Sequence, residues 1–540
     1  MTTGSPRLLR ASATVGAGSM LSRLTGLLRT VTLVGALGTT GLADAYNVAN
    51  NVPNIVYELV AGGVLSAALI PLFVERLDHE DTEGVSAVIS VAIGAMTLAT
   101  FGAVLGAPLI ARLLTLFQND TVGPDQRQAI TSLLRFFLPQ ILLYGVISLL
   151  TALLNARRSF GAAAFAPALN NLVVSAMFVA LPILTKTGLS GPNALANALG
   201  ERRVLVMLGL GTTAGVATNA LILVPALLRE RLGLRFRPNW RDPTVARLLR
   251  LSSWTVAYAV ANQVANFVVL PIASRAGDGE ASAYFYAYLI FIVPHGLLAG
   301  SLMTALTPEL ARSAQSGDLL GMRKSWTSGL RMISLLVLPA SAGLTVVAYP
   351  MVSLLPGLAA ADAKRVAAVL VWYAPGLIAY SIFLFGLRPF YALGDTRTPF
   401  RINLFQNALH IVLALILGIR YGAEGLAATH TLAYAAAALM AFAASARRFG
   451  RVPISEVQPL VGMAAAAIAL ATIVAAALAL LGWSGRHVPA LVQLVIAALL
   501  GLGLYPIFLG VLGAKSDLDS VLGLLKLRGR GGRATPTPIP

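Results

Sequence analysis

The chain has 540 residues, of which 57% are hydrophobic and only 11% are charged. This composition, with a mean hydropathy of +0.78, excludes an ordinary soluble globular protein and is typical of a polytopic membrane protein. A net charge of +18 is common among nucleic-acid-binding proteins, but basic loops facing an anionic lipid leaflet explain it better here, so we expect no nucleic acid to bind.

Apolar stretches of spanning length recur through the whole chain. Their spacing predicts an all-α fold with about 14 transmembrane helices. The expected helices cover residues 9–37, 44–74, 84–115, 128–155, 163–185, 204–228, 245–273, 282–311, 327–356, 364–391, 400–419, 424–446, 458–482 and 488–513. The tail that follows is basic and then rich in Pro and Thr, which predicts a disordered end.

Basic residues are unevenly distributed among the connections. Most of the 40 Lys and Arg residues lie at the N-terminus and after even-numbered helices. The segment from the end of helix six to the first residues of helix seven holds Arg229, Arg231, Arg235, Arg237, Arg241, Arg247 and Arg250. Because basic loops stay on the cytoplasmic side, both termini are expected to be cytoplasmic.

An internal repeat relates the two halves of the chain. Ala43-Asp44-Ala45-Tyr46 and Val52-Pro53-Asn54 in helix two have counterparts in helix eight, Ala281-Ser282-Ala283-Tyr284 and Val293-Pro294-His295. A six-helix repeat, having an even number of helices, predicts two parallel bundles that face each other, as in transporters that open a central cavity alternately to either side. The alternative is chance similarity among biased apolar segments.

The repeat sets the expected domain boundaries. They are residues 1–230 for the N-terminal six-helix bundle, 231–450 for the C-terminal six-helix bundle, 451–515 for helices thirteen and fourteen, and 516–540 for a basic, disordered cytoplasmic tail. The last two helices fall outside the repeat as an appendage.

Two arginines lie well inside the first expected helix. Arg23 is close to the middle of the span, and Arg29 lies about 9 Å further along. A charge at that depth is costly and usually functional, and a guanidinium suits a phosphate group, so we expect Arg23 and Arg29 to bind an anion in a central cavity. The alternative is that Arg23 forms a structural ion pair with Asp44 or Glu58 while Arg29 reaches outward.

Helix two supplies three further cavity candidates. Glu58 is the most deeply placed carboxylate, and it would pair with Arg23, gate the cavity or carry a proton, or else form a packed pair with no transport role. Asp44, near the outer end of the helix, is favoured as a cap over a ligand. Asn54 follows Pro53 and would satisfy backbone groups that the proline frees.

The second half offers neutral polar candidates. Asn262, Asn403 and Asn407 on helices seven and eleven form a weak candidate cation site, but interhelical hydrogen bonding is favoured because no carboxylate is nearby. His295 follows Pro294 and either faces the cavity or packs through hydrogen bonds. The five histidines have no metal-ligand spacing, and no nucleotide-binding loop or catalytic pair is present, so we expect no metal, no cofactor and no enzymatic activity.

Several motifs, in order along nearly the whole chain, resemble the MurJ (MviN) family of lipid II flippases in the multidrug/oligosaccharidyl-lipid/polysaccharide exporter superfamily. They are Ser22-Arg23-Leu24-Thr25-Gly26-Leu27-Leu28-Arg29, Ala43-Asp44-Ala45-Tyr46, Val52-Pro53-Asn54, Leu154-Asn155-Ala156-Arg157-Arg158-Ser159-Phe160, Ala166-Pro167-Ala168-Leu169-Asn170-Asn171 and Phe390-Tyr391-Ala392-Leu393-Gly394-Asp395-Thr396-Arg397-Thr398-Pro399. The resemblance implies that lipid II, the undecaprenyl-pyrophosphate-linked peptidoglycan precursor, moves to the outer leaflet of a bacterial plasma membrane. It also implies that Arg23 and Arg29 hold the pyrophosphate, and that helices thirteen and fourteen form a groove for the lipid tail.

The chain departs from the resemblance where family members carry charge. Tyr57 and Glu58 stand at a basic pair, Leu289 at an arginine and Gly62 at an acidic residue, while a sodium site on helices seven and eleven has amides in place of carboxylates. The sequence therefore leaves the driving force open between Na⁺, H⁺ and the membrane potential.

Other functions remain as alternatives at this stage. An exporter of another lipid-linked oligosaccharide, or a drug or cation antiporter, would share the architecture, although an antiporter predicts carboxylates in the cavity. A glycosyltransferase would need an acidic catalytic residue and usually a large outer loop, and a structural role would recruit cell-wall enzymes. We expect a monomer that contacts lipid II and membrane lipids, with cell-wall synthesis proteins as candidate partners.

Overall fold

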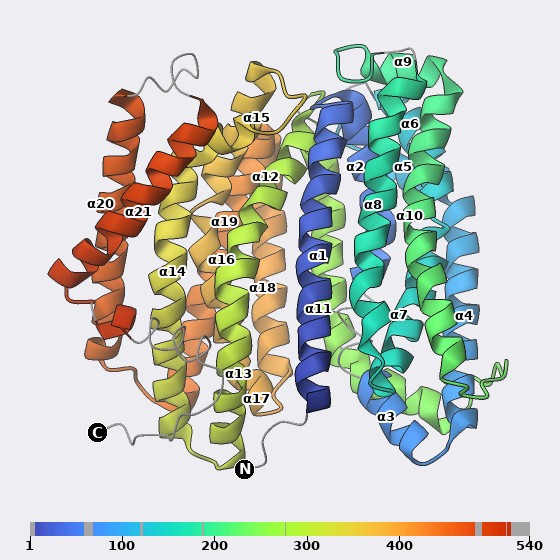
Figure 1. The fold of residues 1–540 in the computed structure, drawn as a ribbon, viewed down its shortest axis with the longest axis horizontal. Coiled ribbons are helices and arrows are strands. Elements are labelled where there is room, and N and C mark those ends of the chain that lie inside the picture. Colours follow the sequence, from blue (N-terminus) through green and yellow to red (C-terminus); the bar gives the residue numbers. More distant parts are fainter. Residues whose placement is uncertain are drawn as a thin grey trace. The chain divides into compact units, whose positions relative to one another are not determined.

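The structure is a computed structural model that describes residues 6–58, 69–118, 123–185, 188–275, 277–480, 489–514 and 516–519. Every secondary-structure element in these ranges is a helix (Figure 1). Helices suit a bilayer because their backbone hydrogen bonds are satisfied within the segment. Within the described ranges, 11 helices are long and apolar enough to span a membrane, or 12 if the bent pair Ala360–Tyr373 and Gly376–Ala392 is one span. An all-α polytopic membrane fold is thus confirmed, and the count of fourteen stays a prediction.

The chain divides into two compact units. Unit 1 comprises Met1–Tyr286, Leu355–Arg365 and Asn403–Leu426, and unit 2 comprises Ala287–Leu354, Val366–Ile402 and Ala427–Pro540. The predicted boundaries at residues 230 and 450 follow the order of the repeat along the chain, and they stay a prediction. The predicted tail, 516–540, lies outside the described residues apart from its first four.

Unit 1 contains most of the helices from the first half of the chain. They are α1 (Pro6–Leu37), α2 (Gly41–Glu58), α3 (Ile70–Asp78), α4 (Thr82–Leu105), α5 (Ala107–Leu114), α6 (Gly123–Phe137), α7 (Gln140–Ala156), α8 (Phe160–Leu184), α9 (Ala194–Gly200), α10 (Arg202–Arg229), α11 (Pro243–Ala273), the start of α12 (Glu280–Pro294), and most of α18 (Arg397–Leu413) with the π-helix η3 (Ala414–Gly418).

The long helix α1 packs along α8 within unit 1 (Figure 1). Gly18 allows this close approach, because a Cβ atom built at that glycine would lie only 2.6 Å from the Cβ of Ala164. The side chain of Asn171 on α8 donates to the carbonyl of Ser22 at 3.2 Å and to the hydroxyl of Thr25 at 3.3 Å. These contacts fix the height and the rotation of α1 beside α8.

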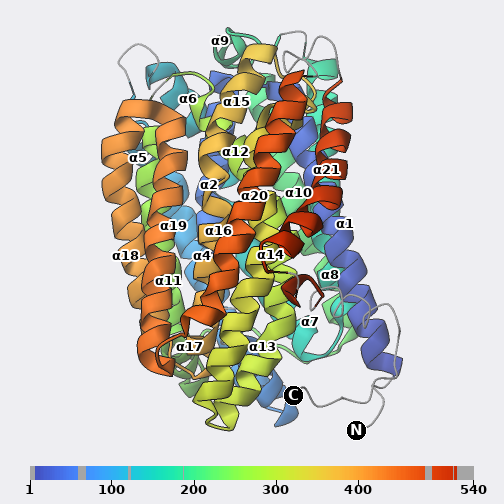
Figure 2. The same ribbon diagram turned by 90° about the vertical axis from the view of Figure 1, so that its left-hand side faces the viewer.

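Unit 2 contains η2 (His295–Ala299), α13 (Gly300–Gln315), α14 (Leu319–Ser353), most of α15 (Ala360–Tyr373), α16 (Gly376–Gly386), α17 (Arg388–Ala392), most of α19 (Ile419–Phe449), α20 (Ile454–Leu480) and α21 (Ala490–Val511). The last two helices pack on α14, and Met463, Leu470 and Leu478 of α20 belong to one buried cluster with Leu335 and Val347 of α14 (Figure 2). Ion pairs join Arg323 to Glu456 at 3.6 Å and Arg331 to Asp517 at 3.1 Å. The appendage is therefore a firmly attached part of unit 2.

Several expected helices are broken, and proline explains most of the breaks. The helix expected over 128–155 divides at Leu138-Pro139, the one over 364–391 divides at Ala374-Pro375, and the one over 84–115 divides at Gly106, just before Pro108. A proline lacks an N–H and starts a new helix more readily than it continues one. Each of these three expected helices is interrupted. Gly123–Ala156 is nevertheless one candidate membrane span, and Ala360–Tyr373 with Gly376–Ala392 passes as a bent pair.

Other boundaries also differ from the predicted ones. The expected helix over 44–74 appears as α2 and α3, with residues 59–68, including the candidate Gly62, outside the described residues. The helices expected at 400–419 and 424–446 meet at Gly422, where a backbone φ of 59° and ψ of −140° interrupts the helix. The short helix α9 was not predicted, since its seven residues are too few to show a period.

Candidate functional site

A cavity of about 920 Å³ opens in unit 1 between α1, α3, α7 and α8. Arg23 and Arg158 line it together with one carboxylate, that of Asp78, and with the amide of Asn155. Apolar side chains complete the wall, among them Val15, Val74 and Phe160. A basic cavity with apolar walls suits a phosphate group that is attached to a lipid.

Arg23 enters this cavity without a carboxylate partner. Its side chain is exposed, and among the described residues neither Arg23 nor Arg158 forms an ion pair within 4.0 Å. The alternative in which Arg23 pairs with Asp44 or Glu58 is therefore not realised in this structure. A guanidinium that no internal carboxylate neutralises can bind an external anion with its full fork of donors.

Arg158 is a site residue that sequence reasoning did not single out. It follows α7 with a backbone φ of 58°, and the N–H of Ser159 donates to the carbonyl of Leu154 at 2.8 Å. This is the left-handed C-terminal cap that glycine usually occupies, so an arginine here is strained. Arg158 lies in the motif Leu154 to Phe160, which is part of the family resemblance. The turn geometry that orients its side chain was not visible in the sequence.

Arg29 does not line the same cavity as Arg23. Six helical residues separate the two, which places them about 120° apart around α1. Arg29 is half-buried and close enough to Tyr144 on α7 to interact with it electrostatically. The predicted pair of arginines is thus divided between two sides of one helix.

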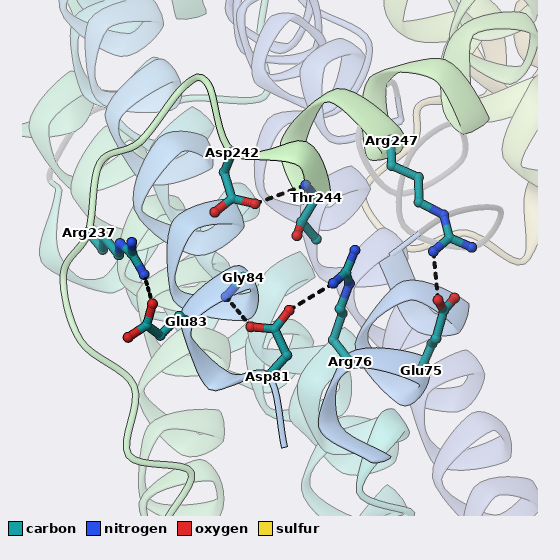
Figure 3. A network of polar contacts seen from close by, with 9 residues as sticks. All are labelled: Glu75, Arg76, Asp81, Glu83, Gly84, Arg237, Asp242, Thr244 and Arg247. Carbon is teal, nitrogen blue, oxygen red and sulfur yellow. Dashed lines mark hydrogen bonds and ion pairs between the residues drawn. The ribbon is translucent and has the colours of Figure 1, made fainter. Parts of the chain in front are cut away.

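A network of polar contacts braces α3, one wall of the cavity (Figure 3). Asp81 caps α4 by accepting the N–H of Gly84 at 2.8 Å, and it also accepts Nη1 of Arg76 at 2.9 Å. Arg247 at the start of α11 donates to Glu75 at 2.6 Å, and this hydrogen bond lowers the pKa of Glu75. The start of α11 is thereby tied to α3.

The segment that leads into α11 is held along α4 by its backbone. The N–H of Arg235 donates to the hydroxyl of Ser86 at 3.2 Å, and the N–H of Arg237 donates to the hydroxyl of Ser90 at 2.7 Å. The Arg237 side chain pairs with Glu83 (Figure 3). Arg235, Arg237 and Arg247 belong to the arginines expected on the cytoplasmic side. These contacts place them at the end of unit 1 that contains α3.

The family model for the lipid II flippase MurJ matches residues 33–500. The chain belongs to the MurJ family. The probable lipid II flippase MurJ of Rhizobium meliloti (strain 1021) is 29% identical over 480 residues, which cover 87% of this chain and 86% of the relative. The lipid II flippase MurJ of Burkholderia cenocepacia is 28% identical over 410 residues, covering 74% and 76%.

Solved structures agree on the fold. A lipid II flippase MurJ in an inward closed conformation superposes with a TM-score of 0.74 at 19% identity, covering 92% of this chain and 98% of that one. An inward-facing multidrug resistance MATE family transporter gives 0.65 at 14% identity, covering 79% and 94%. At these identities the likeness is one of fold alone. With the MurJ family model, it makes this chain a multi-pass bacterial membrane protein.

Asp44, the first candidate on α2, has no exposed side-chain surface. Its Oδ2 accepts the N–H of Gly279 and its Oδ1 accepts the N–H of Ser282, both at 2.7 Å. These donors belong to the first turn of α12, so Asp44 caps that helix from outside it. It is thereby placed as a structural cap, away from the arginine-lined cavity.

The other candidates on α2 lie near Tyr144. The hydroxyl of Tyr144 donates to Oδ1 of Asn54 at 2.9 Å, and Nδ2 of Asn54 donates to the carbonyl of Asn50 at 2.8 Å. Tyr57, at a MurJ basic position, stacks on the ring of Tyr144 with centroids 4.8 Å apart. Glu58 is exposed at the end of α2 and forms no ion pair with any described residue.

His295 lies inside unit 2, and Nδ1 of its ring is 2.9 Å from the hydroxyl of Ser381. The ring also packs edge-on against Tyr380 with centroids 4.7 Å apart, and only 9% of the residue is exposed. Of the two alternatives given for His295, these contacts correspond to packing through hydrogen bonds. Leu289, at a MurJ arginine position, is partly exposed on α12.

The three candidate cation ligands hydrogen-bond to each other. Nδ2 of Asn403 and Nδ2 of Asn407 both donate to Oδ1 of Asn262 at 2.8 Å, which joins α18 to α11 within unit 1. Both amide nitrogens converge on the one oxygen of Asn262, and these contacts link the two helices as interhelical hydrogen bonding predicts. No group of three or more acidic, His or Cys side chains with metal-binding geometry occurs in the described part of the chain.

Proposed function

We propose that this protein is a flippase that moves lipid II from the inner to the outer leaflet by alternating access. Membership of the MurJ family gives the substrate class, because the relatives carry that function in their names. The observation in this chain that carries the proposal is the cavity in unit 1 where Arg23 and Arg158 form no ion pair with any described residue. A transporter of this family rearranges lipid and forms no covalent bond.

In this proposal the two guanidiniums hold the pyrophosphate of lipid II. Each presents a planar fork of donors that matches phosphate oxygens, and together they balance much of the negative charge. Asp78 leaves the cavity with a small net positive charge, which favours release after transport over permanent binding. The apolar wall from α1, α3 and α8 accommodates the first part of the lipid chain.

The location and energetics follow from the same proposal. The protein lies in the plasma membrane with both termini cytoplasmic, because the arginine-rich connection before α11 is at the end of unit 1 where α1 begins. It acts as a monomer. The membrane potential drives the cycle without a bound Na⁺, since amides occupy the candidate cation site, and a positively charged cavity that moves through the field gains free energy.

The test is lipid II translocation in bacterial cells depleted of their own flippase. Cells receive wild type, Arg23→Ala or Arg23→Lys at matched membrane levels, and lipid II in the outer leaflet is quantified. We expect wild type to restore translocation, Arg23→Ala to abolish it and Arg23→Lys to restore it in part, because lysine keeps the charge but loses the bidentate geometry.

Arg235→Ala is the matched control, since it removes an exposed arginine outside the cavity. Equal translocation by Arg23→Ala and wild type would make Arg23 structural and end the anion-site proposal. If wild type moves no lipid II, the substrate is wrong, and the same assay should be repeated with another lipid-linked oligosaccharide.

A further inference from the structure

A second cavity, of about 540 Å³, lies in unit 1 between α5 and α6. Its charged and polar lining consists of Arg112 from α5 and Arg127, Gln128, Thr131, Ser132 and Arg135 from α6. Two prolines complete the lining, and no acidic residue contributes to it in the described part of the chain. Neither the family resemblance nor the proposed transport site accounts for these three arginines.

The polar side chains form a stripe along α6. Arg127, Thr131 and Arg135 recur every four residues, so they lie above one another on one side of the helix, about 12 Å from first to last. The remaining side of α6 is buried through Ile130, Leu133, Leu134 and others. Burial of the apolar side turns the arginine stripe away from the core and toward α5.

One of the three arginines is held in place by a neighbour. Nε of Arg127 donates to the hydroxyl of Thr115 at 3.0 Å, and that hydroxyl is anchored to the carbonyl of Ala111 at 2.9 Å. Thr115 is only 2% exposed. The contact uses the inner nitrogen of the guanidinium, so the two outer nitrogens keep the geometry needed for a bidentate anion.

The positive charge of the three arginines in this cavity favours an anionic ligand. Among the described residues, none of Arg112, Arg127 and Arg135 forms an ion pair. Three like charges around one cavity repel each other unless an anion lies between them. Arg112 and Arg135 are exposed and Arg127 is half-buried. The buried Thr115 that orients Arg127 is the contact that distinguishes this group from three independent, solvated arginines.

The position of this cavity is also informative. The 24-residue helix α4 begins at the polar network of Figure 3 and ends next to α5, so the two ends are about 36 Å apart. That distance is close to the thickness of a bilayer. Figure 1 shows α5 and α6 toward the end of unit 1 opposite α3. The arginines therefore lie at the opposite end from the basic connection before α11, contrary to the usual distribution of positive charge.

We propose that the α5–α6 cavity binds a phosphate-bearing group, a pyrophosphate or a phosphodiester, at the end of unit 1 remote from the Arg23 cavity. Arg127 and Arg135 bind its oxygens from one side and Arg112 from the other. The hydroxyls of Thr131 and Ser132 line the cavity but donate to the carbonyls of Arg127 and Gln128, at 2.7 and 2.9 Å. The proposal stands on this cavity alone and does not require that the protein transports lipid II.

The experiment measures binding of inorganic pyrophosphate to the full-length protein in neutral detergent by calorimetry. Arg23→Gln/Arg158→Gln protein serves as the background, because it removes the arginines of the first cavity. We expect this background to bind pyrophosphate, and the added changes Arg112→Gln, Arg127→Gln and Arg135→Gln to weaken binding by at least about tenfold. Unchanged affinity, or a background that does not bind at all, would overturn the proposal.

A milder variant protects the test against misfolding. Thr115→Val keeps all three charges and nearly the same volume, but it releases Nε of Arg127. We expect about threefold weaker pyrophosphate binding with an unchanged thermal unfolding temperature. Full affinity in Thr115→Val, together with full affinity in Arg127→Lys, would also count against a built site.

The source of the phosphate group is resolved in lipid nanodiscs. The background protein is placed in discs of phosphatidylcholine alone or with phosphatidylglycerol, and pyrophosphate binding is measured in both. If anionic headgroups occupy the cavity, phosphatidylglycerol weakens pyrophosphate binding in the background protein and has no such effect in the triple variant. Equal affinity in both discs assigns the cavity to a pyrophosphate from a substrate or from solution.

Discussion

The turn between α3 and α4 in unit 1 and the turn between α13 and α14 in unit 2 follow the same backbone course. The N–H of Asp81 donates to the carbonyl of Arg76 at 2.8 Å, and the N–H of Asp318 donates to the carbonyl of Ser313 at 3.0 Å. Each aspartate then caps the next helix by accepting an N–H from the third residue after it, at 2.8 Å in both turns. Such matching turns are what an internal repeat predicts.

The side chains at these turns are different. The left-handed position is Glu80 in the first turn, with φ of 57°, and Gly317 in the second, with φ of 69°. The first aspartate also pairs with Arg76, and Glu75 pairs with Arg247. The repeat therefore preserves what the backbone needs to reverse direction, whereas the charges belong to one half of the chain.

The helix breaks at two equivalent prolines also share a backbone feature but differ in side-chain contacts. Pro139 and Pro375 stand at helix breaks, directly before the first residues of α7 and α16, and Tyr144 and Tyr380 follow five residues after them. Tyr144 donates to an asparagine on α2, whereas Tyr380 packs against a histidine. The two halves therefore differ at these equivalent positions, with a tyrosine–asparagine hydrogen bond in the first and tyrosine–histidine packing in the second.

The largest difference in stability loss between equivalent positions of the repeat is expected for substitutions at Asp44 and Ser282. Asp44→Ala removes a buried carboxylate and leaves the N–H groups of Gly279 and Ser282 without acceptors, which should cost about 3 kcal/mol. Ser282→Ala leaves those two acceptors in place and removes a hydroxyl that accepts Nδ2 of Asn47 at 3.1 Å and also hydrogen-bonds the Asp44 carboxylate. It should cost less, about 1 kcal/mol. Thermal unfolding in detergent measures both.

Asp44→Glu is the control, since it retains the charge but lengthens the side chain in a fully buried site. Equal losses for Asp44→Ala and Ser282→Ala would mean that the cap on α12 is not asymmetric. In that case the two repeat positions share one structural role.

The next effect separates the strain in Arg158 from its charge. Arg158→Gly relieves the left-handed backbone and should raise stability by up to about 1 kcal/mol. Lipid II translocation should nevertheless fall about tenfold, since a charge-assisted contact to phosphate is lost. Arg158→Lys keeps the strain and the charge, so it should retain much of the activity. Full activity in Arg158→Gly would make this arginine a simple helix terminus.

A smaller pair of opposite effects tests the repeated turn itself. Gly317→Ala places a Cβ on a left-handed residue and should destabilise unit 2 by about 1 kcal/mol. Glu80→Gly makes the reverse change in unit 1 and should stabilise it by up to about 1 kcal/mol. Urea or thermal unfolding of both variants checks the signs, and effects of the same sign would show that the two turns are not equivalent.

The helical membrane fold, the MurJ family and one residue that lines the cavity, Arg23, could be read from the sequence. Arg23 could be found because an arginine in the middle of an apolar span is rare. Arg158 could not, since its role depends on the left-handed turn after α7 and on the packing of α1 against α8. The cavity between α5 and α6 was missed for a similar reason: Arg112 and Arg127 lie at the ends of expected spans, where arginine is ordinary.

The division of the expected helices shows another limit of the sequence. Apolar composition predicts that a segment crosses the membrane, but it does not show where a proline turns one span into two shorter helices. For the same reason, the sequence did not show that Arg23 and Arg29 have different neighbours. Both stand in one apolar run, but they lie on different sides of α1.

The smallest effect concerns the charges that distinguish the first turn. The hydrogen bond from Arg247 lowers the pKa of Glu75, so this pair stabilises the fold above the unfolded-state pKa, and its contribution is lost as the pH falls through the lower folded-state pKa. The hydrogen-exchange protection factors of residues 75–84, corrected for the intrinsic exchange rate at each pH, should therefore fall on acidification in wild type and much less in Glu75→Gln, where no pair can titrate. The turn between α13 and α14 is the internal control, because it has the same aspartate cap and carries Arg312 at the position equivalent to Glu75. An equal fall in protection in both turns would assign the pH response to the shared caps, and the ion pair with Arg247 would then contribute nothing measurable to holding α3 in place.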